Sequence, residues 1–222
     1  MESPSNQGLE SAFKAVQQIQ KEMQRTNTLS LADVVAFGGA EALETAGCGR
    51  LIVQVGRVDN KTGNDAPVIP WGEGISSASA DKAFSTSGLG ADEIALLLGA
   101  LGELRRVVAE TKLASTASNK NEDEDEDDQP FEAEPFVPTT FGARDAIYGA
   151  KMVKGDFGNK YLQMLVKGKT GQDDLKSALM DDQKIKAAVM KYASNEAAFL
   201  KNLPDAYLKL TKLGEAYITR NS

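Results

Sequence analysis

The segment Gly90–Thr111, GADEIALLLGALGELRRVVAET, is the most apolar long stretch in the chain and constrains the fold most. Asp92 and Glu93 fall in its first turn, where negative charge suits the helix dipole, and the arginine pair 105–106 lies further along. Its large apolar residues cover more than one helical face: Ile94, Leu96, Leu97, Leu98, Leu101 and Leu104. We therefore expect a central helix that is buried on most sides.

Hydrophobic periodicity predicts further helices on both sides of this one. The predicted helical ranges are Leu9–Arg25, Leu31–Gly47, Phe157–Val166, Asp173–Met180, Asp182–Ala193 and a final helix from Asn195 or Pro204 to Tyr217. Ser30 is the expected N-cap of the second helix, with Asp33 completing a capping-box-like pair. Leu51–Val55 is the one short extended segment, and no strand ladder or repeat is visible. The sequence thus predicts an all-α fold in a single domain spanning residues 1–222.

The net charge of −7 is concentrated in one place. Glu122–Asp128 is a run of seven acids, EDEDEDD, so the rest of the chain is formally neutral. The run lacks the alternating ligands and glycine turn of a calcium loop, and no lysine–arginine cluster indicates a nucleic-acid surface. It lies within an acidic, proline-containing insertion expected at about 114–138. This insertion is interpreted as a solvated surface loop or a contact for a basic partner.

The chain contains no histidine and a single cysteine, Cys48. The absence of histidine excludes His-activated serine or cysteine nucleophiles and removes the usual haem or zinc ligand. Cys48 allows no internal disulfide and is expected to be a small buried residue between two glycines. Six Met and five Tyr are scattered over the chain and indicate no site by themselves.

No segment is long and apolar enough to predict a membrane-spanning helix. The first residues show no basic-then-apolar leader. The protein is therefore expected either to stay where it is made or to have a targeting segment upstream of Met1. Whether Met1 is the true start is left open.

Three stretches resemble the class I haem peroxidases, the family of ascorbate peroxidase and cytochrome c peroxidase. The first is Ser30–Gly47 followed by Gly56-Arg57-Val58-Asp59, similar to that family's S-x-A-D helix and G-R-x-D turn. The second is Ser85–Leu101, and the third runs from Asp156 to Gly214. Their order and spacing agree over about two thirds of the chain.

The resemblance implies a two-lobed helical fold with haem between the lobes, reducing hydrogen peroxide with ascorbate or a protein donor. It also places the proximal histidine at or beside Leu101 and its orienting aspartate at or near Lys176, so both would be lost here. The proximal-side tryptophan has no counterpart between Thr139 and Asp156. The distal helix, with its catalytic arginine and histidine, would precede Leu9 and is expected to be missing.

Trp71-Gly72 and Gly88-Leu89-Gly90 are similar to a histidine-lacking line of this family found in the plant thylakoid lumen. This similarity implies a chloroplast protein without cofactor or catalytic residues, acting as an accessory subunit of a multi-subunit complex. An extrinsic lumenal subunit of photosystem II is one such role, and a cytoplasmic or stromal protein is the alternative location.

Two other functions are left open. One is a haem-dependent peroxidase whose iron is held by Cys48, a Met, a Tyr or a ligand from a segment upstream. The other is a small-molecule binder, which predicts an open apolar pocket beside Leu101.

Overall fold

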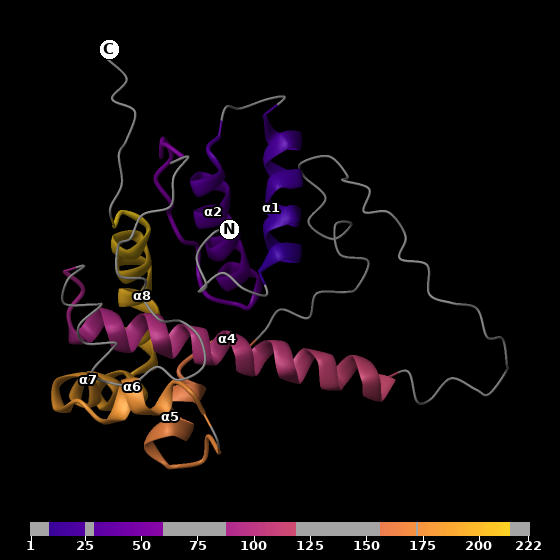
Figure 1. Cartoon of the computed structure of the whole chain (residues 1–222). Helices are drawn as coiled ribbons and strands as arrows, with labels where there is room; N and C mark the ends of the chain where they lie inside the picture. Colours follow the sequence, from indigo (N-terminus) through magenta and orange to yellow (C-terminus); the bar gives the residue numbers. More distant parts are fainter. Residues whose placement is uncertain (1–8, 25–28, 60–87, 119–155, 172, 214–222) are drawn as a thin grey trace, which may run out of the picture.

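The structure is a computed structural model, and it describes residues 9–24, 29–59, 88–118, 156–171 and 173–213 (Figure 1). Apart from a single-residue β-bridge at Arg57, the regular structure in these residues is helical, which confirms the all-α prediction. The helices are α1 (Glu10–Met23), α2 (Leu31–Thr45), α4 (Ala91–Ser118), α5 (Lys160–Val166), α6 (Lys176–Met180), α7 (Gln183–Ser194) and α8 (Glu196–Thr211). Within the described ranges, no helix combines the length and apolarity needed to cross a membrane.

The central element is α4, as predicted. Figure 1 shows it running across the molecule, with α5, α6 and α7 along one side and α8 crossing its N-terminal half. The residues from Ile94 to Leu98 are all buried, as is Ala100, so this part of the helix faces neighbours on most sides. Glu93 begins the helix by accepting a hydrogen bond from the Gly90 N–H at 2.8 Å.

The helix α4 continues to Ser118, beyond the expected end at Thr111. The prediction that an irregular insertion starts at about residue 114 is therefore wrong at its beginning. Lysine and alanine in TKLASTAS favour continued helix, and the polar composition had concealed this. The rest of the expected insertion, including Glu122–Asp128, lies outside the described residues, as do Trp71-Gly72 and the 139–155 segment.

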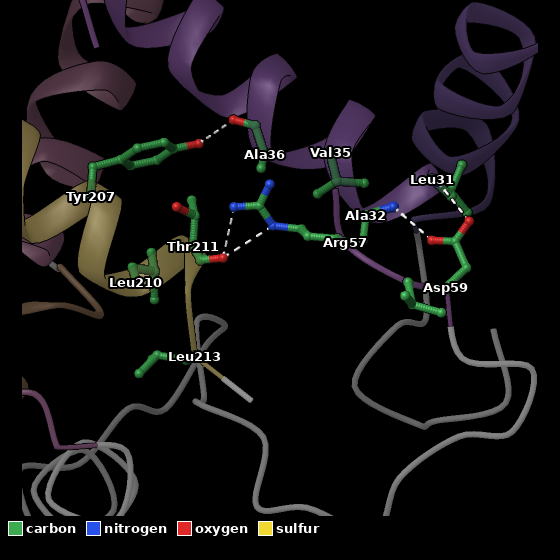
Figure 2. Close-up of a pocket in the computed structure, with 11 residues that line it drawn as sticks. Leu31, Ala32, Val35, Ala36, Arg57, Asp59, Tyr207, Leu210, Thr211 and Leu213 are labelled. Atoms are coloured by element: carbon green, nitrogen blue, oxygen red, sulfur yellow. Dashed lines mark hydrogen bonds between the residues drawn. The ribbon is translucent and has the colours of Figure 1, made fainter. Parts of the chain in front are cut away.

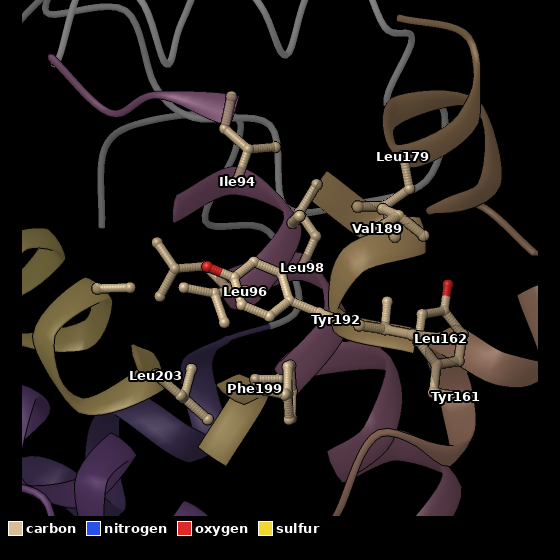
Figure 3. Packing of buried hydrophobic residues seen from close by; sticks show 14 of the residues in the cluster. Ile94, Leu96, Leu98, Tyr161, Leu162, Leu179, Val189, Tyr192, Phe199 and Leu203 are labelled. Carbon is tan, nitrogen blue, oxygen red and sulfur yellow. The ribbon is translucent and has the colours of Figure 1, made fainter. Parts of the chain in front are cut away.

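The core is built where α7 and α8 meet α4 (Figure 3). The rings of Tyr192 and Phe199 pack edge to face with centroids 6.4 Å apart, and Phe157 stacks on the other side of Phe199 at 6.3 Å. Leu98 and Leu162 are fully buried beside them. The inner face of α7 is formed by the buried residues Ile185, Ala188, Val189 and Tyr192.

Side-chain caps fix where the last two helices begin. Asp182 accepts hydrogen bonds from the N–H groups of Lys184 and Ile185, which starts α7. Asn195 accepts from the Ala198 N–H at 2.9 Å, which starts α8 at the earlier of the two predicted positions. The helix passes through Pro204 without ending, with the buried residues Leu203 and Ala206 holding it on either side.

The first helix is the most weakly attached. α1 packs against α2, none of its residues is buried, and Leu9 and Ile19 are exposed. Ser30 caps α2 by accepting from the Asp33 N–H at 3.0 Å, as predicted. The reciprocal half of the capping box is absent, because the Asp33 carboxylate is turned toward Gly56 and Arg57 instead.

Candidate functional site

Two places in the described structure concern function: the face of α4 that carries Leu101, and the junction of α2, the segment after it and α8. On α4, two glycines allow α5 to approach closely. A Cβ at Gly102 would overlap the Tyr161 ring, and one at Gly99 would lie 2.9 Å from a methyl group of Leu162. The side of α4 that carries Gly99 and Gly102 is therefore filled by α5 side chains.

A buried carboxylate fixes α5 in that position. Glu103 is fully buried and accepts from Arg106 at 2.7 Å, from the Tyr161 N–H at 2.7 Å and from the Gly158 N–H at 3.1 Å. It thereby caps the start of α5 from another helix, since Asn159 makes no side-chain cap. Sequence reasoning missed Glu103. The only signal was a single acid within an otherwise apolar helical face.

The two arginines of α4 are held in ion pairs. Arg105 contacts Asp174 at 2.7 Å, and Arg106 is shared between Glu103 and Glu110. Because α4 continues twelve residues past Arg106, the arginine pair does not compensate the charge of a helix end. Both guanidinium groups already face carboxylates, so the arrangement does not form an anion clamp.

Beside Gly102 lies a polar cavity of about 330 Å³. On its wall the Tyr161 hydroxyl donates to Asp173 at 2.6 Å. Burial, and then the nearby Asp173 carboxylate, raise the pKa of Tyr161 well above its ordinary value. Such a phenol stays protonated at neutral pH and is poorly suited to bind iron as a phenolate.

The resemblance expects the iron ligand at or beside Leu101 and its aspartate at or near Lys176, and this placement stays a prediction. The Leu101 side chain is partly buried and packs against the core. Lys176 is the exposed first residue of α6 and makes no ion pair with any residue of the described ranges. Leu101 lines neither of the two hollows found among the described residues, and an open apolar pocket beside it stays a prediction.

Cys48 is buried, as predicted. Burial, and then the charge of Glu44, raise the pKa of its thiol to about 11. A thiol in this state is neither a good nucleophile nor a ready metal ligand. Among the residues that the structure describes, no group of three or more Cys, Asp or Glu side chains is arranged to hold a metal ion.

The second place is built from the two motifs that resemble the family pattern. The carboxylate of Asp33 on α2 forms a buried ion pair with Arg57 at 2.8 Å. The same guanidinium donates from Nε and Nη2 to the Thr211 carbonyl at 3.1 and 2.9 Å, which ties the end of α8 to α2 (Figure 2). Asp59 accepts from the Leu31 and Ala32 N–H groups and caps α2 from outside.

A groove opens on this junction, with a volume of about 580 Å³. Figure 2 shows Val35 and Leu31 from α2 facing Leu210 and Tyr207 from α8 across it. The Tyr207 hydroxyl donates to the Ala36 carbonyl at 2.8 Å and closes one end. The lining is largely apolar with a few polar groups, a composition typical of binding sites.

The sequence profile described as "Peroxidase" matches residues 1–195 of the chain. The chain belongs to the peroxidase family. This match covers the Asp33–Arg57 junction, α4 and α7, and it confirms the resemblance on which the fold prediction rested.

Three curated relatives are ascorbate peroxidases by name. The chain is 30% identical over 225 residues to "Probable L-ascorbate peroxidase 7, chloroplastic" of Oryza sativa subsp. japonica, covering 96% of this chain and 56% of the relative. It is 25% identical to "L-ascorbate peroxidase 5, peroxisomal" of Arabidopsis thaliana, covering 95% and 63%. For "Probable L-ascorbate peroxidase 8, chloroplastic" of Oryza sativa subsp. japonica the identity is 26%, covering 96% and 42%. The chain thus spans about half the length of the curated relatives it matches.

This membership corrects one prediction. The chain was expected to need no cofactor, but it belongs to a family whose relatives are haem-dependent, and that expectation is wrong. The identity of an iron ligand is a separate matter. The side chains at Leu101 and Lys176 do not fit haem ligation, because one is a hydrocarbon and the other an exposed ammonium.

Proposed function

We propose that this member of the peroxidase family is non-catalytic and works by binding, as an accessory subunit of a larger protein assembly. The observation that carries the proposal is the pair Leu101 and Lys176, which we assign to the former positions of the proximal histidine and its aspartate. With no histidine in 222 residues, the His–carboxylate pair that orients and tunes the iron cannot form.

The packing around α4 supports the same proposal. Leu162 and Tyr161 fill the spaces over Gly99 and Gly102, and Glu103 locks α5 against α4. The contact between α4 and α5 is thus made by side chains of this chain. We treat the whole chain as one peroxidase-like domain. It keeps the fold of the family and acts through a binding surface instead of a catalytic site.

The location proposed is the chloroplast, and within it the thylakoid lumen, on the photosynthetic membrane. Two of the three relatives are chloroplastic by name, while the third is peroxisomal. An extrinsic subunit of photosystem II fits this location and the accessory role. A stromal or cytoplasmic protein is the competing placement.

The assembly part is tested by fractionating native chloroplast membranes and following the chain by antibody on a native gel. Co-migration with a membrane complex, lost on a salt wash and regained on adding the recombinant chain, is the expected result. A chain found only as a free monomer contradicts it.

The assignment of Leu101 is tested by titrating haemin into Leu101→His, with Leu101→Asn as a matched polar control. A sharp Soret band gained by the histidine variant alone is expected if this position faces the iron. Equal spectra for both variants contradict the assignment.

A second candidate is a haem-dependent peroxidase with non-histidine ligation, which the relatives' names favour. The described tyrosine and cysteine candidates count against it, because the pKa values of Tyr161 and Cys48 are raised. Peroxide-dependent oxidation of ascorbate by the haemin-loaded chain decides between the two.

A further inference from the structure

Thr170 lies in the turn that follows α5. Gly168 and Gly171, on either side of the Lys169–Thr170 pair, have φ angles of 68° and 65°, which glycine adopts without strain. The Lys169 N–H donates to the Met164 carbonyl at 2.8 Å, which closes the turn onto the end of the helix. The turn lies at the edge of the molecule, away from α1 and α2 (Figure 1). A tight surface turn thus presents a partly exposed hydroxyl side chain.

The sequence after Thr170 has a charge pattern that suits a kinase substrate. Asp173 and Asp174 follow it three and four positions later. Among the described serines and threonines, only Ser30 also has an acidic residue three positions on, and its hydroxyl is already used to cap α2. The Thr170 hydroxyl makes no hydrogen bond with the part of the chain that the structure describes. Of the two hydroxyl groups, that of Thr170 is therefore the one available for modification.

Thr170 also lies beside a cation with unused hydrogen-bond donors. Thr170, Arg105 and Asp174 line the polar cavity of about 330 Å³ beside Gly102. Arg105 donates from Nη1 to Asp174 at 2.7 Å, and its Nε and Nη2 groups have no partner within the described ranges. The Arg105 side chain is 46% exposed, so it can turn toward a new acceptor.

A phosphate group on Thr170 changes the balance of charge in this cavity. It carries about two negative charges at pH 7 and three strong acceptor oxygens, more than the Asp174 carboxylate offers. Arginine binds phosphate through bidentate, charge-assisted hydrogen bonds, and a phosphate attached to a neighbouring turn competes at high effective concentration. Because the phosphate and the carboxylate repel each other, we expect the phosphate to displace Asp174 from Arg105 instead of joining the ion pair.

We propose that Thr170 is a phosphorylation site and that Arg105 binds the phosphate and releases Asp174. The modifying enzyme is a protein kinase that selects acidic residues after the acceptor. In the transfer, the Thr170 hydroxyl oxygen forms a bond to the γ-phosphorus of a nucleoside triphosphate. The bond from that phosphorus to the bridging oxygen breaks, which leaves a nucleoside diphosphate, and the hydroxyl proton is released. Phosphorylation of Thr170 does not depend on the accessory function proposed above.

The first test asks whether the site is modified in the native protein. The chain is purified from its native tissue by antibody in the presence of phosphatase inhibitors, and the peptide that contains Thr170 is sequenced by mass spectrometry. Phosphate on Thr170 is the expected result. An unmodified Thr170 overturns the site.

The second test asks whether the acidic residues direct the kinase. The recombinant chain is incubated with Mg²⁺-ATP and a kinase that selects an acid at the third position after the acceptor. Asp173→Asn should lower the initial rate of phosphate incorporation at least tenfold. Asp181→Asn, which removes an exposed acid outside this pattern, is the matched control and should change the rate less than twofold. Equal rates for the two variants overturn the recognition of Thr170 by charge.

The third test asks where the phosphate goes. Full-length chain with phosphothreonine incorporated at position 170 is titrated by phosphorus NMR, which reports the second pKa of the phosphate, ordinarily about 6. Arg105→Gln removes a cation and should raise this pKa by roughly 0.3 to 0.7, the size expected for a partly exposed ion pair. Asp174→Asn removes the competing carboxylate and should lower it.

The two variants form a matched pair, because both lose the same contact between Arg105 and Asp174. A general loosening of the turn moves the pKa of the phosphate in the same direction in both. Opposite shifts are the result expected from a phosphate bound to Arg105. Shifts of the same sign, or no shift in either variant, overturn the assignment of Arg105.

Discussion

The carboxylate of Asp33 and the guanidinium of Arg57 form a buried ion pair at 2.8 Å, with both side chains about 97% covered. Through this pair α2, the extended segment and the end of α8 are joined at one point, since Arg57 also donates to the Thr211 carbonyl. The two residues belong to the two motifs that resemble the family pattern. Their role in this chain is therefore to hold the fold together.

Replacing Asp33 with asparagine should lower the free energy of unfolding by about 3 to 5 kcal/mol, because Arg57 is left buried without its carboxylate. Asp59→Asn is the matched control. It alters an exposed helix cap and should cost less than about 1 kcal/mol. Urea unfolding of both variants measures the difference, and equal losses contradict the role assigned to the pair.

The same carboxylate predicts a pH dependence. Burial alone raises the pKa of Asp33, but hydrogen bonds from Gly56 and Arg57 outweigh burial and hold the pKa below its ordinary value of 3.8. A folded-state pKa below the unfolded one stabilises the fold above the unfolded pKa, and this contribution is lost as the pH falls through the folded value. Wild type should therefore lose stability below about pH 4 more steeply than Asp33→Asn. Parallel curves in acid titrations followed by circular dichroism would argue against this assignment.

Two glycines in helices should respond oppositely to alanine. Gly102→Ala places a methyl group against the Tyr161 ring and should cost about 1 to 3 kcal/mol. Gly38 has nothing within 4 Å of the added Cβ, so Gly38→Ala should gain up to about 1 kcal/mol from helix propensity. Thermal melting of the two variants is the measurement. A stabilised Gly102→Ala would mean that α5 does not pack against α4 as described.

Loss of the Glu103 charge should release the start of α5. Glu103→Gln should cost about 3 kcal/mol, since a buried acceptor of four hydrogen bonds is weakened and Arg106 loses its main partner. Glu110→Gln, at the exposed partner of the same arginine, should cost under about 0.5 kcal/mol. Hydrogen exchange at residues 158–163 should accelerate in Glu103→Gln only.

Cys48 should be inert in the folded chain. With its pKa raised to about 11 by burial, it should react with an aromatic disulfide reagent at least tenfold more slowly than the same thiol in urea. Rapid reaction under native conditions at pH 7 contradicts the buried placement of the thiol. Cys48 would then again be a candidate ligand of haem iron.

The sequence predicts those parts of the fold whose contacts join residues close together in the chain. The α4, α7 and α8 starts could be predicted because their caps and apolar faces lie within one or two turns of sequence, as with Asn195 and Ala198. The Asp33–Arg57 and Glu103–Tyr161 contacts join residues 24 and 58 positions apart, and nothing local encodes them. The predicted end of α4 came too early in the sequence, because a polar helical segment and a polar loop can have the same amino-acid composition.

For the site, the sequence indicated what is missing more readily than what is present. The lack of histidine was plain, and it led to the incorrect expectation that no cofactor is needed. The groove between α2 and α8 was not foreseen, because its walls come from residues about 150 positions apart. Leu51–Val55 was predicted as a short extended segment, but the hydrogen bonds that tie Leu51 and Gly56 to α2 were not foreseen.

Our main proposal is that this peroxidase-family chain does not reduce peroxide. It is tested most directly by the initial rate of peroxide-dependent ascorbate oxidation by the purified chain mixed with an equimolar amount of haemin, against haemin alone. Equal rates are expected, because Leu101 and Lys176 provide neither an iron ligand nor its orienting carboxylate. A rate at least a hundredfold above haemin, accompanied by a sharp Soret band, would contradict it.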